Sequence, residues 1–229
     1  WKVKVTDQIG LSEWSDEATF TTRPEKSYTK KVAYIPVSYK NETPKTVNKV
    51  LYEKARLVSE YYYQETYGEE ELDYKFIFDE FKELSETLSS YKNNYKSPRI
   101  QIIEDAIELA KNKADFKEDN FDSIVVLDTS KMRAGSPTSD SLANTAFVNH
   151  DDDDYSVWAH ELGHALFNWN DYYGPKTAGM THEWNLMGNG HYKRQKPAPV
   201  MSYNKVQAGW LDFKTVGKGS YEINLLTEL

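Results

Sequence analysis

Two histidines and a glutamate in the second half of the chain have the residue types and spacing of a zinc hydrolase. His160 and His164 are four residues apart, and Glu161 directly follows the first of them. On a helix, both histidines project from the same face. They can bind Zn²⁺ with a third protein ligand, which leaves a fourth position for water. We expect Glu161 to be the general base that takes a proton from this water.

Several residues downstream could supply the third metal ligand. Asp171 lies seven residues after His164, Glu183 lies nineteen residues after it, and His191 follows further along the chain. His182 is a weaker candidate. Cysteine is absent, so every ligand must come from His, Asp or Glu. This ligand chemistry favours a catalytic zinc site over a thiolate-bound structural site.

The two histidines need a helix to position them, and a strand is expected just before it. Residues 155–171, YSVWAHELGHALFNWND, place apolar side chains on the other faces of the expected helix. Residues 144–150, NTAFVNH, predict a short strand. We expect this strand to form an exposed sheet edge that binds an extended peptide. An edge strand without a ligand fits the pattern equally well.

Four aspartates, Asp151 to Asp154, separate this strand from the helix. Their charges suit the positive end of the helix dipole, and they can supply an N-cap. Clusters rich in carboxylate oxygens also bind Ca²⁺. We therefore expect helix capping here, with a calcium site as the alternative.

The segments before the histidines alternate between strand and helix patterns. Buried-strand patterns occupy residues 31–39 and 121–130, and a further strand is expected at 74–81. Pro36 indicates that the first strand lies at a sheet edge or ends there. Helices are expected from Thr43 and Pro44 to Gly68, over 79–91, and from Ser97 and Pro98 onward. This succession predicts a mixed α/β (α+β) domain with a mixed, twisted sheet.

The first 23 residues have the pattern of a β-hairpin. Apolar and polar residues alternate from Trp1 to Val5, a turn follows at Gln8 to Gly10, and the pattern resumes at Phe20. This segment resembles the last two strands of a fibronectin type III module, which is a β-sandwich. Residues 24–30 are expected to be a linker, and residues 31–229 the catalytic domain.

Three stretches of the second half carry a family resemblance: HELGHALFNWNDYYG, EWNLMGNG and RQKPAPVMSYNKVQAGWLD. They resemble the immune inhibitor A family of secreted zinc metallopeptidases, and the resemblance covers about residues 30–215. It implies a zincin-like domain with an active-site helix and a C-terminal subdomain. By position, His160 and His164 match the zinc histidines, Glu161 matches the base, and Met187 matches the methionine turn beneath the metal.

The sequence departs from the zinc-peptidase pattern HExxHxxGxxH at the end of the helix. Phe167 stands at the glycine position and Asn170 at the position of the third histidine. The residues NDYY match the acidic segment of the family only if one residue is inserted before them, and Asp171 then takes the acidic position. We expect Asp171 to be the third ligand, with Glu183 as the alternative and His191 as a further one.

Two tyrosines after the expected methionine turn could assist catalysis. Tyr192 and Tyr203 could each donate a hydrogen bond to the oxyanion that forms when water attacks a carbonyl. For either tyrosine alone, a plain surface or core position is the more common role. Beyond them, residues 221–226 have the pattern of a strand without a visible partner, so the catalytic domain is expected to be incomplete at this end.

Composition narrows the class of protein. Hydrophobic residues make up 39% of the 229 residues, and no apolar run has the length that a bilayer requires. The formal net charge of −8 argues against a nucleic-acid partner. The chain opens at Trp1 in an expected strand, so a pro-segment or further domains are expected upstream.

Together these observations predict a secreted zinc endopeptidase that cleaves proteins or peptides. Two alternatives stay open. One is a non-catalytic adhesive protein of the cell surface that zinc stabilises, and the other is a zinc hydrolase of cell-wall cross-links.

Overall fold

The computed structural model describes residues 4–6, 12–14, 28–43, 45–68, 70–137, 142–151, 154–173, 183–191 and 196–211. Its largest sheet has the strand order β4-β3-β6-β7, and β5 also pairs with β3. Every ladder in this sheet is parallel. The strands are β3 (Tyr28–Ser38), β4 (Glu70–Phe76), β5 (Lys82–Glu83), β6 (Ser123–Asp128) and β7 (Thr145–Asn149).

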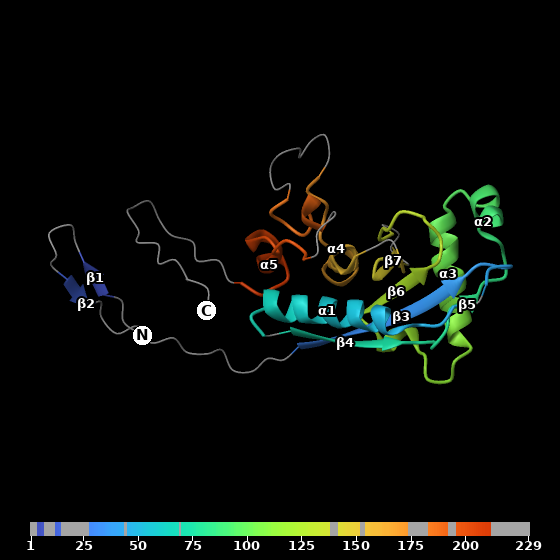
Figure 1. Cartoon of the computed structure of the whole chain (residues 1–229), viewed down its shortest axis with the longest axis horizontal. Helices are drawn as coiled ribbons and strands as arrows, with labels where there is room; N and C mark the ends of the chain where they lie inside the picture. The colour runs from blue at the N-terminus through green and yellow to red at the C-terminus, as the bar shows by residue number, and fades with distance from the viewer. Residues whose placement is uncertain are drawn as a thin grey trace.

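Helices cover both faces of this sheet, and their arrangement can be followed in Figure 1. Side chains from α1 and α4 pack on one face, and side chains from α2 and α3 pack on the other. The predicted mixed α/β class is therefore confirmed. The helices are α1 (Lys49–Glu65), α2 (Leu88–Asn94), α3 (Pro98–Lys111), α4 (Tyr155–Phe167) and α5 (Ser202–Gln207), with short turns η1 (Glu118–Asn120) and η3 (Asn189–His191).

The alternation of side chains along β3 divides the core into two parts. Val32 and Tyr34 face α1 and α4, whereas Ala33, Ile35 and Val37 face α3. All six residues of β6 are buried, as the continuous apolar pattern predicted for a strand covered on both faces. The result is a rigid layer beneath α4.

The orientation expected for the sheet needs a correction. Apart from the separate N-terminal hairpin, antiparallel pairing among the described residues is limited to the isolated bridges Thr46–Glu80 and Gly135–Phe147. Pro36 also lies in an interior strand, not at an edge, because β3 pairs with β4 on one side and β6 on the other. The proline is tolerated because its missing N–H would face the gap between the end of β4 and the start of β5.

Several element boundaries differ from those expected. Helix α1 begins at Lys49, where the Asn48 side chain accepts hydrogen bonds from two backbone N–H groups, and not at Thr43 or Pro44. Residues 79–91 form β5 and the start of α2 in place of one short helix. Strand β4 begins before residue 74 and ends at Phe76. The helix expected from Ser97 and Pro98 is confirmed as α3.

The N-terminal hairpin is formed by β1 (Lys4–Thr6) and β2 (Ser12–Trp14), which pair antiparallel. The returning strand was expected near Phe20, which lies outside the described residues, as does the segment 221–226. The expected linker 24–30 overlaps β3, since Tyr28 already pairs with Glu70. No helix within the described ranges is long and apolar enough to cross a membrane.

Candidate metal centre

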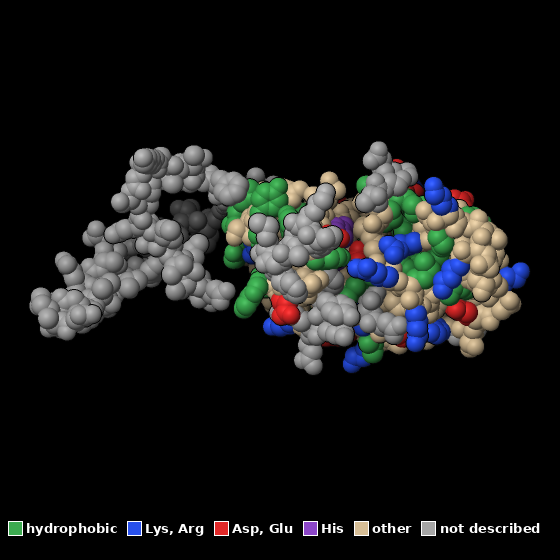
Figure 2. Space-filling view, turned by 90° about the horizontal axis from the view of Figure 1, so that it is seen from above, with side chains coloured by type: hydrophobic (Ala, Val, Ile, Leu, Met, Phe, Trp, Pro, Cys, Tyr) green, Lys and Arg blue, Asp and Glu red, His purple; other side chains and the backbone are tan. Residues whose placement is uncertain are grey.

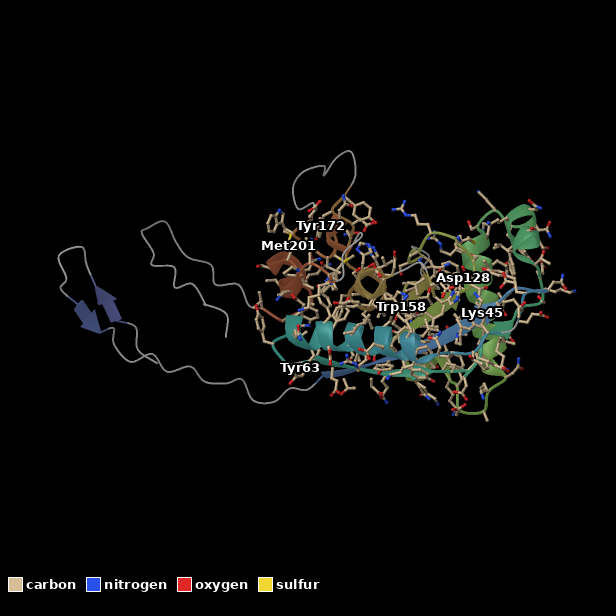
Figure 3. The ribbon with its side chains drawn as sticks, in the orientation of Figure 1. Lys45, Tyr63, Asp128, Trp158, Tyr172 and Met201 are labelled. Carbon is tan, nitrogen blue, oxygen red and sulfur yellow. The ribbon has the colours of Figure 1, made fainter. Side chains whose placement is uncertain are left out.

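Helix α4 carries the two histidines on the side away from the sheet. Its other side is apolar, and Trp158 is 1% exposed and packs 5.5 Å from the Tyr34 ring on β3 (Figure 3). Asp154 occupies the N-cap position, although its side chain makes no capping hydrogen bond. The apolar contacts of α4, more than its cap, therefore hold it against the sheet.

Three donor atoms converge at the C-terminal half of α4. The Nε2 atoms of His160 and His164 lie 3.1 Å apart, and the Asp171 Oδ1 lies 3.1 Å from the first and 3.2 Å from the second. Ligands at 2.0–2.1 Å around a tetrahedral zinc ion lie about 3.3 Å from one another. The three donors therefore fit a tetrahedral metal ion, and among the residues that the structure describes they form the one such cluster found.

Backbone carbonyl groups fix the orientation of both imidazoles. The His160 Nδ1 lies 2.9 Å from the Leu186 carbonyl oxygen, and the His164 Nδ1 lies 2.5 Å from that of Trp169. Each Nδ1 must carry the proton to donate to an oxygen, which leaves the Nε2 lone pair directed at the cluster. This is the tautomer that metal-binding histidines adopt.

The end of α4 explains why the third donor is Asp171 and not residue 170. Helix α4 continues through Phe167, and Asn168 adopts the left-handed conformation, with φ 53° and ψ 37°. Asparagine tolerates this conformation better than most residues. The chain therefore reverses its direction at residue 168, one residue after position 167, where the pattern HExxHxxGxxH has its glycine. Trp169, which is 1% exposed, packs in the core directly after this reversal. The residue that reaches the histidines is therefore Asp171, one position after the third histidine of the pattern.

The expected methionine turn lies against this part of α4. Met187 is fully buried, and its Sδ would be only 2.8 Å from a Cβ placed on Gly163. The Asn185 Oδ1 accepts hydrogen bonds from two backbone N–H groups, those of Met187 and Met201, each at 3.3 Å. The Met187 carbonyl accepts from the Tyr172 N–H at 2.8 Å. This turn therefore links α4, the Asp171 segment and the start of α5.

Glu161 lies beside the donor cluster in a site that favours a strong base. It is 6% exposed, and its Oε2 has no hydrogen-bond partner among the described residues. Burial raises the pKa of Glu161, while the nearby charges of His160 and His164 oppose this rise. Burial also opposes ionisation of Asp171, but the neighbouring His160 and His164 imidazoles, when they are protonated, hold its pKa well below the usual value.

A cavity of about 1110 Å³ opens onto Glu161, His164 and Asp171. Tyr173 also lines it, and sequence reasoning missed this residue. Its ring stacks 5.9 Å from that of His160. Burial, followed by the charges of Asp171 and Glu161, raises the pKa of Tyr173 to about 12. Tyr173 is the second tyrosine of NDYY, two residues after the acidic position, and this spacing was the signal that could have identified it.

The free edge beside the cavity is not β7, contrary to expectation. Gly135 exchanges two backbone hydrogen bonds with Phe147, each 3.0 Å long, and the Ser136 hydroxyl donates to the Thr145 carbonyl oxygen. The segment 133–137 therefore covers β7 and lines the cavity itself. Because backbone groups alternate in direction, those of residues 134 and 136 point away from β7.

Two of the remaining predicted site residues, Glu183 and Tyr203, are not brought to the cavity. Glu183 is exposed and lies outside the donor cluster. Tyr203 is 57% exposed and contacts the Tyr172 ring at 6.5 Å. The His191 side chain and Tyr192 lie outside what the structure describes. The calcium site expected at Asp151 to Asp154 also stays a prediction, since residues 152 and 153 are not described.

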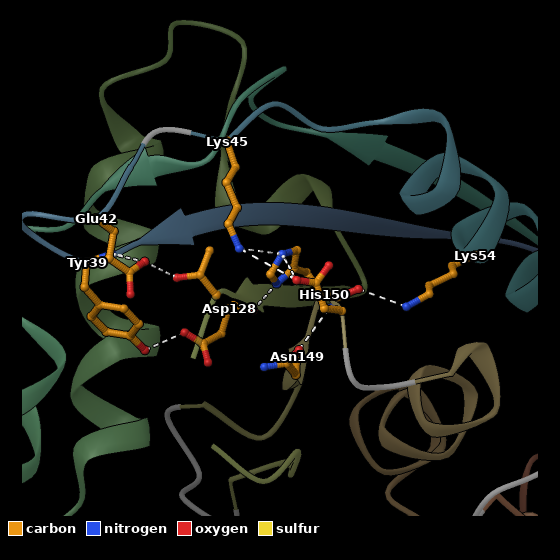
Figure 4. A network of polar contacts seen from close by, with 9 residues as sticks. Tyr39, Glu42, Lys45, Lys54, Asp128, Asn149 and His150 are labelled. Carbon is orange, nitrogen blue, oxygen red and sulfur yellow. Dashed lines mark hydrogen bonds and ion pairs between the residues drawn. The ribbon is translucent and has the colours of Figure 1, made fainter. Parts of the chain in front are cut away.

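A second polar cluster lies at the carboxyl ends of β6 and β7 (Figure 4). The His150 Nδ1 donates to the Asp128 carbonyl oxygen at 3.0 Å, and Lys45 and Asp151 lie 3.2 and 2.9 Å from the His150 Nε2. Lys54 donates to the His150 carbonyl oxygen at 2.9 Å. Since these groups satisfy one another, the cluster holds the segment that leads from β7 into α4.

Comparisons with known proteins find distant similarity to solved structures. OgpA from Akkermansia muciniphila matches at 14% identity with a TM-score of 0.48, over 82% of this chain and 62% of that chain. A structure described as a chaperone–substrate complex matches at 12% identity with a TM-score of 0.41, over 88% of this chain and 37% of that chain. The chain thus spans less than two thirds of either neighbour. No protein-family model and no curated protein matches, so membership of the immune inhibitor A family stays a prediction.

Proposed function

We propose that the protein is a zinc-dependent peptidase in which His160, His164 and Asp171 hold the metal. The facing pair of imidazole Nε2 atoms, 3.1 Å apart, supports this most strongly. Two unprotonated nitrogens repel one another at this distance, and a cation held by both removes the repulsion. The carboxylate of Asp171 completes a donor set of two nitrogens and one oxygen, which is typical of catalytic zinc and excludes a thiolate site.

When bound, zinc supplies Lewis acidity that polarises a carbonyl group and lowers the pKa of water. Glu161 is the general base: its unpartnered Oε2 takes a proton from the attacking water and passes it to the leaving amine. The raised pKa of Glu161 makes its carboxylate a stronger base. The Tyr173 hydroxyl, which stays protonated at neutral pH, donates a hydrogen bond to the developing oxyanion.

The substrate in this proposal is an extended peptide. The outward backbone groups of residues 134 and 136 offer it a sheet edge, and the cavity that this edge borders contains Glu161. An extracellular location and an upstream pro-segment remain predictions that accompany this function.

Replacing Glu161 with glutamine tests the function. Glu161→Gln should keep one zinc per chain by metal analysis and lose about 100-fold or more in turnover of an unfolded protein, because general base catalysis contributes that much. Glu183→Gln, the same change on an exposed carboxylate, should keep both zinc and turnover. If Glu161→Gln cleaves the protein as fast as the parent, the mechanism is wrong. Activity on cell-wall fragments alone would identify a different zinc hydrolase.

A further inference from the structure

Two arginines from separate elements line the same cavity as Glu161 and Asp171. Arg99 lies in the first turn of α3, and Arg133 lies in the segment 133–137 that covers β7. Figure 2 shows Lys and Arg side chains on the same face of the molecule as a histidine side chain. The cavity lining thus contains the two carboxylates Glu161 and Asp171, and the two arginines add positive charge to the same lining.

Arg99 is positioned by packing. Its guanidinium lies 5.8 Å from the centre of the Phe147 ring, and its Nη1 would be 1.9 Å from a Cβ placed on Gly135. Gly135 therefore provides the space that the guanidinium occupies. The Arg99 Nε is buried and has no hydrogen-bond partner in the described part of the chain.

Neither cavity arginine has a carboxylate partner among the described residues. The other arginine with a described side chain, Arg56, pairs with both Glu53 and Glu60. The chain has 36 acidic and 28 basic residues, so acidic partners for an arginine are plentiful. Two arginines that line a cavity without such a partner are therefore suited to bind an acidic group from outside the chain. The Arg133 charge reaches the cavity, since this residue is part of the cavity lining.

We propose that Arg99 and Arg133 bind a carboxylate of the substrate close to the bond that is cleaved, so that the enzyme prefers acidic peptides. This inference rests on the proposed peptidase function. A guanidinium matches a carboxylate with two parallel hydrogen bonds, and the partly buried position of Arg99 strengthens those that it forms. The carboxylate is either an Asp or Glu side chain or the free C-terminus of a short peptide.

The test compares peptides that differ only in charge. One series carries Glu, Gln or Lys beside the scissile bond, each with a free or an amidated C-terminus. The parent should cleave the Glu peptide with a kcat/KM about tenfold above the Gln peptide, as expected for one charge-assisted hydrogen bond. Arg133→Gln and Arg99→Gln should each reduce this ratio, and Arg133→Glu should shift the preference to the Lys peptide. Lys131→Gln, the same charge change just outside the cavity, should keep the ratio.

The outcomes separate this inference from the proposed function. If the free C-terminus and not the side chain gives the preference, the arginines bind a terminal carboxylate. If the parent cleaves Glu and Gln peptides equally, or if both arginine variants keep the preference, the inference is wrong and the peptidase function stands. If the zinc-loaded parent cleaves no peptide, the function fails. Calorimetric binding of Glu and Gln peptides to Glu161→Gln and Glu161→Gln/Arg133→Gln then tests the arginines directly.

Discussion

Gly163 directly precedes the metal donor His164, and replacing it with alanine tests how α4 and the methionine turn fit together. A Cβ at this position would lie 2.8 Å from the Met187 Sδ and 2.9 Å from the Trp169 Cε3. Alanine in a helix stabilises it by about 1 kcal/mol relative to glycine. Overpacking a filled core costs about 1–3 kcal/mol. Met187 and Trp169 are 0% and 1% exposed, so neither can move into solvent.

We therefore expect Gly163→Ala to lower the free energy of unfolding by about 1 kcal/mol, because the overpacking exceeds the helix gain. Zinc affinity should also fall, by about tenfold, because the Leu186 carbonyl that orients His160 belongs to the displaced turn. Urea denaturation of the metal-free protein measures the stability, and competition with a chelator measures the affinity.

A double-mutant cycle with Met187→Ala identifies the cause. Met187→Ala alone should cost about 2–5 kcal/mol through the cavity that it leaves. In this background the new methyl group gains space, so Gly163→Ala should be less destabilising by about 1 kcal/mol. The reasoning is refuted if Gly163→Ala raises the free energy of unfolding of the parent, as it would at an unobstructed helix position, or if the two changes are additive.

Three further predictions concern the metal centre and the sheet behind it. Asp171→Asn keeps the shape of the ligand but removes its charge, so zinc affinity measured with a chelator should fall more than about 100-fold, since losing an outer partner alone costs 10–100-fold. Tyr173→Phe should lower kcat by about 100-fold while metal analysis still finds one zinc per chain. His150→Asn removes an imidazole whose pKa burial lowers, and the amide can still donate to the Asp128 carbonyl oxygen. The unfolded chain takes up the His150 proton near pH 6.5 and the folded chain only below it, so the free energy of unfolding is fully retained above about pH 6.5 and decreases as the pH falls. Urea denaturation of the metal-free protein between about pH 7.5 and about pH 5.5 should show a smaller decrease for the variant.

Each of these predictions has an outcome that contradicts it. Unchanged zinc affinity in Asp171→Asn would exclude this residue as a ligand. Loss of zinc in Tyr173→Phe would show that the hydroxyl acts through Asp171 and not on the substrate. The same pH dependence for His150→Asn and the parent would show that His150 keeps its ordinary pKa in the folded chain.

The sequence predicted those features that depend on local periodicity. The four-residue spacing of His160 and His164 determined that both face one side of a helix, whatever the helix packs against. The continuous apolar run of β6 and the Pro98 start of α3 were likewise readable, because burial on both faces and proline at a first helical turn are local properties.

Only the tertiary structure decided which distant residues meet. Pro36 is interior to the sheet because β4 and β5 leave a gap beside it, and no local signal records that gap. The third donor depends on where the chain reverses, and the left-handed Asn168 and the buried Trp169 set that point. Arg99 and Tyr173 come to the cavity from segments far apart in the chain. Contacts of this kind depend on packing and on how the connecting segments close, which the spacing of residues does not encode.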